Sequence, residues 1–191
     1  MLTAAGHHVI LACRTEKKAD TAAQACVDYA LSGGATRPGG TAKGMECDLA
    51  NLSSIRAFAK RLKGKPLDSL VLNAGLALNT KDKIPERTRD GFEMTVGVNH
   101  LGHFLLASLL VDDLKGQKGI ADPRIVVTAS PVHDPMSGGG NVGSKATLGN
   151  LAGLAAGSSF SMIDGGPYDP DKVRVFAFEI NIIFRLALIF F

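Results

Sequence analysis

The sequence predicts an α/β protein built on a doubly wound parallel sheet. Short apolar runs of strand length alternate along the chain with longer segments of helical composition, and polar residues or glycines follow the strand ends. Strands that alternate with helices favour a parallel sheet covered by helices on both faces. The length of 191 residues suits one domain with a core of its own.

Two pairs of a strand and a helix open the chain. His8 to Cys13 form a short run suited to a buried parallel strand, and Glu16 to Leu31 follow with helical composition and many alanines. Gly44 to Cys47 predict the next strand, and Ser53 to Leu62 predict a helix with one apolar face. This repeat is the first indication of the parallel sheet.

The middle of the chain continues the alternation. Leu67 to Leu72 predict a third strand, and Arg124 to Ala129 predict a fourth. Between them we expect a long helix that ends near Leu114. Asp90 is its predicted N-cap, because Glu93 stands at the third helical position, as in a capping box.

The last third of the chain changes composition twice. Glycine and small polar residues dominate Ser137 to Gly166, which predicts a long, partly ordered loop. From Val173 to Phe191, fifteen of nineteen residues are apolar. A membrane anchor is one interpretation of this tail, and it leaves membrane association open. Three charged residues argue against it, because each would cost about 2.5–3.5 kcal/mol near mid-bilayer; they are Arg174, Glu179 and Arg185.

Composition excludes several classes of protein. The formal charge of +3 is spread along the chain without a basic run, so nucleic acid is not an expected partner. Cys13, Cys26 and Cys47 show no C-x-x-C spacing, which argues against a disulfide framework or a zinc site and fits a reducing compartment. The first residues lead within a few positions into a strand and show no targeting pattern.

Candidate cofactor contacts follow three of the predicted strands. In doubly wound dinucleotide-binding folds, an arginine after the second strand accommodates the 2′-phosphate of NADP, and loops at the carboxyl ends of the strands hold the rest. Taken alone, Arg14 is more simply interpreted as a solvated arginine. The candidate residues that follow the next two strands favour the cofactor contact instead. The candidate cofactor-binding residues are Arg14, Asp48, Leu49, Asn73, Ala74 and Gly75.

The segment Val98-Asn99-His100-Leu101-Gly102-His103-Phe104 resembles the helix that carries the active-site asparagine in the short-chain dehydrogenase/reductase family. The resemblance implies a Rossmann-like fold and makes Asn99 that residue. Ser130, at the end of the fourth strand, matches the family's catalytic serine; a strand-end serine without a role is the alternative. His100 and His103 are spaced like metal ligands, but no third ligand accompanies them, so we expect no metal.

A subfamily is indicated by residues 140–154 and 161–166, which are similar to the insertion after the catalytic serine in light-dependent protochlorophyllide oxidoreductases. Arg87 to Glu93 also resemble that subfamily. The resemblance implies an enzyme in plastids that uses NADPH to reduce the C17=C18 double bond of the small-molecule substrate protochlorophyllide after light absorption, with a tyrosine as proton donor. The alternatives are a retinol-dehydrogenase-like NADP-dependent reductase and a degenerate, non-catalytic binding module.

Two motifs match only by spacing. Gly138 to Gly143 satisfy G-x-G-x-x-G but lack the preceding strand and following helix that give this motif meaning. Tyr168 and Lys172 satisfy the family's Tyr-x-x-x-Lys spacing, but Pro170 lies between them, and the subfamily has its pair farther along. Neither motif is therefore taken as a site.

The resemblance also predicts what the sheet lacks. The phosphate loop, the first strand, the last strands and the Tyr/Lys pair of the family have no counterpart here, so we expect an incomplete sheet. The strands at His8 and Met45 should have no sheet connection to those at Val71 and Val126. We expect residues 1–172 to form a partial NADP-binding domain, residues 173–191 to be a tail that does not belong to it, and the chain to be an inactive fragment of the parent enzyme. The sequence predicts no oligomeric state.

Overall fold

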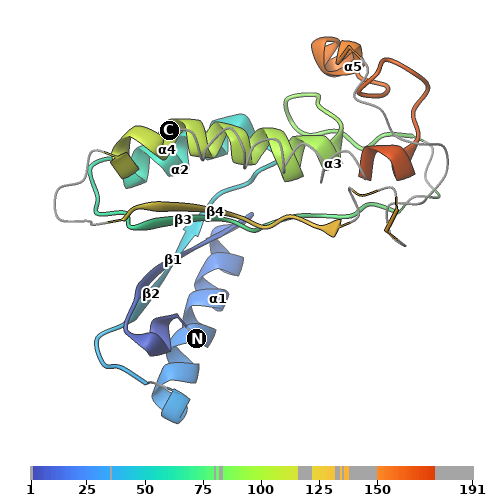
Figure 1. Ribbon diagram of the computed structural model, residues 1–191. Coiled ribbons are helices and arrows are strands. Elements are labelled where there is room, and N and C mark those ends of the chain that lie inside the picture. The colour runs from blue at the N-terminus through green and yellow to red at the C-terminus, as the bar shows by residue number, and fades with distance from the viewer. Residues whose placement is uncertain are drawn as a thin grey trace. The chain divides into compact units, whose positions relative to one another are not determined.

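The computed structural model describes residues 2–34, 36–79, 81, 84–115, 122–131, 134, 136–137 and 150–174 (Figure 1). The chain forms two compact units, one of Met1–Asp48 with Ser53–Arg61 and one of Leu49–Leu52 with Leu62–Phe191. The predicted G-x-G-x-x-G spacing at 138–143, the first part of the predicted insertion and tail residues 175–191 lie outside the described residues.

The first unit contains a two-stranded parallel sheet and the helix that covers it. Strand β1 (His8–Cys13) pairs with β2 (Thr41–Glu46), and helix α1 (Glu16–Tyr29) connects them after a 3-10 turn η1 (Thr3–Ala5). Helix α1 packs closely on β2, because a Cβ at Gly44 would come within 2.5 Å of the Ala19 backbone. Figure 1 shows α1 in blue along this pair of strands.

The predictions for this unit are confirmed with shifted boundaries. Strand β1 has the predicted limits, and α1 begins where predicted because the Thr15 hydroxyl accepts a hydrogen bond from the Lys18 amide at 3.4 Å. A π-helical turn, η2 (Ala30–Gly34), follows α1, and Gly33 ends it with a φ of 92°. Strand β2 begins three residues before the predicted Gly44, because pairing with β1 extends the ladder into polar residues.

The second unit contains the other two strands and the longest helical stretch. Strand β3 (Ser69–Leu72) pairs in parallel with β4 (Arg124–Val127). Helix α3 (Met94–Val96), the π-helical turn η3 (Gly97–Gly102) and α4 (His103–Lys115) form one continuous helix. Helix α2 (Leu52–Leu62) is divided between the units. In the described part of the chain, β1–β2 and β3–β4 are separate sheets, as predicted.

The long helix passes a length-and-composition test for a membrane span, but its burial gives it another role. Its most apolar window is 56% buried inside the protein. The buried side of α4 consists of residues at helical spacing, namely Leu106, Ala107, Leu110 and Leu114. We interpret the helix as the core helix of the second unit.

The predicted N-cap of this helix is wrong. Gly91 has a φ of 87°, a left-handed conformation that interrupts the chain between Asp90 and the helix. The helix begins after Glu93, whose own carboxylate accepts a hydrogen bond from the Val96 amide at 2.8 Å. Asp90 instead accepts one from the amide of Leu52, the first residue of α2, at 2.8 Å. The two acids therefore cap two different helices.

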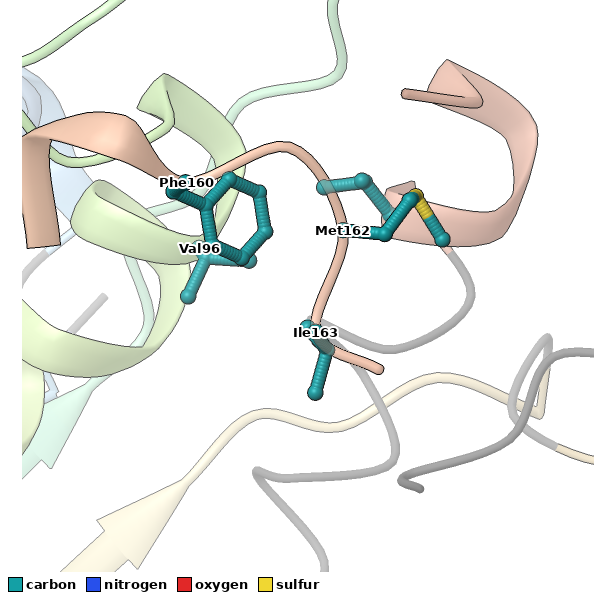
Figure 2. Close-up of a cluster of buried hydrophobic side chains, with 5 residues drawn as sticks. Val96, Phe160, Met162 and Ile163 are labelled. Carbon is teal, nitrogen blue, oxygen red and sulfur yellow. The ribbon is translucent and has the colours of Figure 1, made fainter. Parts of the chain in front are cut away.

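Residues 150–174 contain short helical elements, and the first two of these lie within the predicted loop. They contain the short helix α5 (Ala152–Ala155), a 3-10 turn η5 (Gly157–Ser159) and helical residues 170–174. Figure 2 shows Phe160 against Val96 of the long helix, with Met162 and Ile163 following along the chain. Val173, the first residue of the predicted tail, is fully buried in the same cluster. Apolar residues spaced among the glycines and serines thus anchor this segment.

Candidate functional site

In the first unit, two of the predicted site residues follow the carboxyl ends of the strands. Arg14 comes directly after β1 and is exposed. Asp48 comes two residues after β2 and is half-buried, and its amide donates to the Ser54 hydroxyl at 3.0 Å. Burial, and then the charges of Asp48 and Glu46, raise the pKa of the Cys47 thiol to about 12, so this cysteine stays protonated at neutral pH.

In the second unit, an exposed turn follows β3. It consists of Asn73, Ala74 and Gly75, all three predicted as cofactor contacts. The Thr128 hydroxyl, just after β4, donates to Asn73 Oδ1 at 2.9 Å. Ser130 is two residues farther along and half-buried. Because β3 and β4 are parallel neighbours, this places Ser130 and the turn at one edge of their sheet.

The long helix holds the turn through two side chains. Asn99 is 2% exposed, and its amide group donates to the Leu76 carbonyl at 2.8 Å and accepts from the Leu76 amide at 2.9 Å. His103 Nε2 lies 2.7 Å from the Ala74 carbonyl oxygen. His103 is buried, which lowers its pKa, although the contact with Ala74 opposes the shift. These contacts leave the opposite side of the turn exposed.

Two glycines are informative about space around the turn. A Cβ at Gly75 would meet only Asn99, with Oδ1 at 3.5 Å, so the protein's own packing leaves room for a Cβ there. A Cβ at Gly102 would lie 2.7 Å from the Leu49 carbonyl oxygen. Gly102 therefore lets the helix approach Leu49, which belongs to this unit. The structure thus brings Leu49, the turn and Asn99 together around one helical turn.

The metal alternative for the two histidines is given no support by their surroundings. The described residues contain no group of three possible ligands from histidine, cysteine, aspartate or glutamate. The His100 ring instead contacts the Phe104 ring, with 6.2 Å between centroids. His103 is directed to Ala74.

Tyr168 has surroundings that its spacing to Lys172 did not predict. Asp169 accepts a hydrogen bond from the Asp171 amide at 3.1 Å, and the helical turn starts at Pro170. Tyr168 therefore lies before this helix, so the helix does not bring Tyr168 and Lys172 onto one face. Burial and then the Glu93 carboxylate raise the pKa of Tyr168 to about 12.

Glu93 is a buried acid, and its burial was not predicted from the sequence. It is 1% exposed, and burial raises its pKa, although hydrogen bonds from Val96, Thr95 and Tyr168 oppose the shift. Arg87 donates to the Gly91 carbonyl and to the Phe160 carbonyl, each at 3.0 Å. Residues 87–93 therefore hold the segment that contains Phe160 and Tyr168.

Known proteins resemble the chain over most of its length. The sequence profile of the short chain dehydrogenase family matches residues 1–154. The chloroplastic protochlorophyllide reductase of Cucumis sativus is 44% identical over 170 residues, covering 86% of this chain and 40% of that protein. The corresponding reductase of Chlamydomonas reinhardtii is 42% identical over 169 residues, with the same coverage. The chain thus spans about two fifths of the length of these relatives.

Solved structures share the fold. An uncharacterised protein from Mycobacterium paratuberculosis matches with a TM-score of 0.64 and 26% identity, over 94% of this chain and 51% of that chain. A 3-ketoacyl-ACP reductase from Sinorhizobium meliloti matches with a TM-score of 0.61 and 23% identity, over 98% of this chain and 58% of that chain, which is evidence for the fold alone. With the profile match over more than half its length, the chain belongs to the short-chain dehydrogenase/reductase family.

Proposed function

We propose that the chain is part of a plastid enzyme that uses NADPH to reduce protochlorophyllide. The observation that carries the proposal is the 42–44% identity, over about 86% of the chain, to proteins named chloroplastic protochlorophyllide reductase. The chain covers only about 40% of those proteins. The complete reaction is therefore assigned to the parent enzyme, and we expect the chain by itself to be inactive.

Two features, one in each unit, support a nicotinamide cofactor. Asn73, Ala74 and Gly75 of the turn are exposed, and a Cβ at Gly75 would meet only Asn99, at ordinary contact distance. A backbone without a Cβ lets a ligand approach closely. Arg14 is exposed after β1, which by the family resemblance corresponds to the second strand of such folds. An arginine after that strand accommodates the 2′-phosphate of NADP. When bound, NADPH would supply the hydride.

The two predicted catalytic residues have different surroundings. Both polar groups of the Asn99 side chain bond the backbone of Leu76, so we assign Asn99 to support of the turn. Ser130 lies at the carboxyl edge of β3–β4, and we assign its hydroxyl to the polar network around the reacting group. We assign the proton donor to no described residue.

Titration of the expressed chain with NADPH and NADH, followed by nicotinamide fluorescence, tests the cofactor assignment. Losing a charge-assisted contact costs about 1.5–3 kcal/mol, so Arg14→Ala should weaken NADPH binding roughly tenfold to a hundredfold and leave NADH unchanged. Lys17→Ala, an exposed change of equal charge on α1, is the control. An equal loss of affinity for NADPH and NADH would contradict the assignment of Arg14 to the 2′-phosphate.

Substrate turnover separates the remaining alternatives. Illumination of the parent gene product with NADPH and protochlorophyllide should shift the pigment's absorbance to that of chlorophyllide, with no change in the dark. Reduction of retinal in the dark would favour the retinol-dehydrogenase-like reductase. A folded chain that binds neither cofactor would favour the non-catalytic binding module.

A further inference from the structure

Two side chains of the long helix contact the backbone of the turn after β3 and of the residue that follows it. Asn99 contacts the backbone of Leu76, and His103 contacts the carbonyl of Ala74. Four residues of helix rise about 6 Å, and two residues of extended chain span about 6.7 Å. The spacing of the two side chains therefore matches the spacing of the two backbone sites. Gly75 lies between them in the sequence and is exposed.

The chemistry of the second contact fixes the state of the histidine. A backbone carbonyl oxygen only accepts hydrogen bonds, so the Nε2 that lies 2.7 Å from Ala74 carries the proton. Nδ1 is buried and has no hydrogen-bond partner among the described residues. A proton on Nδ1 would be a buried donor without an acceptor, which is costly. The neutral ring protonated on Nε2 is the state that fits.

We infer that His103 is a positioning residue for the cofactor turn: its Nε2 proton holds the Ala74 carbonyl and thereby sets the backbone at Gly75 for NADPH. The inference rests on the proposed function, because it concerns the same turn. It goes beyond it by assigning a role to a helix residue that contacts no predicted ligand. The adjacent Gly102 brings the same helical turn against Leu49, so His103 is fixed where the helix meets both loops of this unit.

Three substitutions at His103 distinguish the reach of the hydrogen-bond donor from the size of the side chain. The donor nitrogen of glutamine is as many bonds from Cα as Nε2 of histidine, whereas that of asparagine is one bond short. His103→Gln should therefore bind NADPH within about twofold of the wild type. His103→Asn and His103→Leu should bind about threefold to tenfold more weakly, the effect of one lost hydrogen bond. Leu110→Ala, a buried change two turns along the same helix, should lower the melting temperature without changing NADPH affinity.

Two measurements do not depend on NADPH. In ¹⁵N NMR spectra of the 191-residue chain, the His103 ring should show the neutral Nε2-protonated tautomer at pH 7. Hydrogen exchange at the Leu76 amide should be faster in His103→Asn than in the wild type, and unchanged in His103→Gln. A charged ring, an Nδ1-protonated tautomer, or equal exchange in all variants would overturn the inference.

The outcomes distinguish the two proposals. If the wild-type chain binds no NADPH but the tautomer and the exchange rates are as expected, the cofactor assignment fails while the positioning of the turn by His103 stands. If NADPH binds equally well to His103→Asn, His103→Leu and His103→Gln, the cofactor assignment stands and the inference fails.

Discussion

The approach of the long helix to the turn before it depends on one glycine and one methyl group. A Cβ at Gly97 would lie 2.3 Å from Thr88 Cγ2, far inside the 3.5–4.0 Å at which carbon atoms pack, and its next neighbour would be 3.5 Å away. Thr88 is buried, and its hydroxyl accepts a hydrogen bond from the Phe92 amide at 3.1 Å. Rotating Thr88 away from the clash would break this bond.

Gly97→Ala should therefore destabilise the protein despite favouring the helix. Gly97 has helical dihedral angles, so alanine by itself would contribute about 0.5–1 kcal/mol. Overpacking costs about 1–3 kcal/mol, which leaves a net loss of up to about 2.5 kcal/mol. Thr88→Ser removes Cγ2 and keeps the hydroxyl, at about 0.8 kcal/mol for one buried carbon. In the Thr88→Ser background, Gly97→Ala should become neutral or stabilising.

Urea unfolding followed by circular dichroism gives the four free energies of this double-mutant cycle. Ser108→Ala, on the exposed side of α4, controls for helix propensity and should change the free energy of unfolding by less than about 0.5 kcal/mol. Additive effects of Gly97→Ala and Thr88→Ser would refute the reasoning, because they would show that the methyl group does not limit the approach of the helix.

Three further predictions follow from buried groups. Burial raises the folded-state pKa of Glu93, so its contribution to stability is present below the unfolded-state pKa and lost as pH rises through the folded-state pKa. In urea unfolding from pH 4 to 8, Glu93→Gln should flatten this decline in stability, whereas Glu86→Gln, at an exposed position, should not. Parallel pH profiles for wild type and Glu93→Gln would contradict the assignment. Ile163→Ala should lower the free energy of unfolding by about 2–5 kcal/mol, against little change for Ile84→Ala, which is 84% exposed; equal effects would mean that the cluster in Figure 2 does not stabilise the fold. Cys47 has a pKa of about 12 and is 5% exposed, so it should react with iodoacetamide at pH 8 far more slowly than the half-buried Cys13. Mass spectrometry of the labelled peptides measures the two rates, and comparable rates would show that the Cys47 thiol is accessible.

Local sequence patterns were sufficient to predict the strands and the family. The alternation of apolar runs and helical segments located all four strands to within about three residues. The predicted separation into two pairs of strands is also confirmed in the described residues, because it follows from the order of strands in a doubly wound sheet. Residues placed directly after strands, such as Arg14 and Asn73, needed no knowledge of distant contacts.

The helix start shows where local patterns fail. Asp90 and Glu93 have the spacing of a capping box, and nothing in that spacing reveals that Gly91 between them adopts a left-handed conformation. The partner of Asp90 is the amide of Leu52, far away in the sequence. An acceptor that caps another helix cannot be told from one that caps its own without the tertiary contact.

The site residues divide in the same way. The sequence by itself determined the family, the order of the strands and which residues follow them at the carboxyl edges, because these depend on neighbours along the chain. The tertiary structure decided that His103 holds Ala74, that Asn99 holds Leu76, and that Tyr168 lies at Glu93. Each of these contacts joins residues more than twenty positions apart, and burial, not residue type, sets the direction of the pKa shifts of Glu93 and His103.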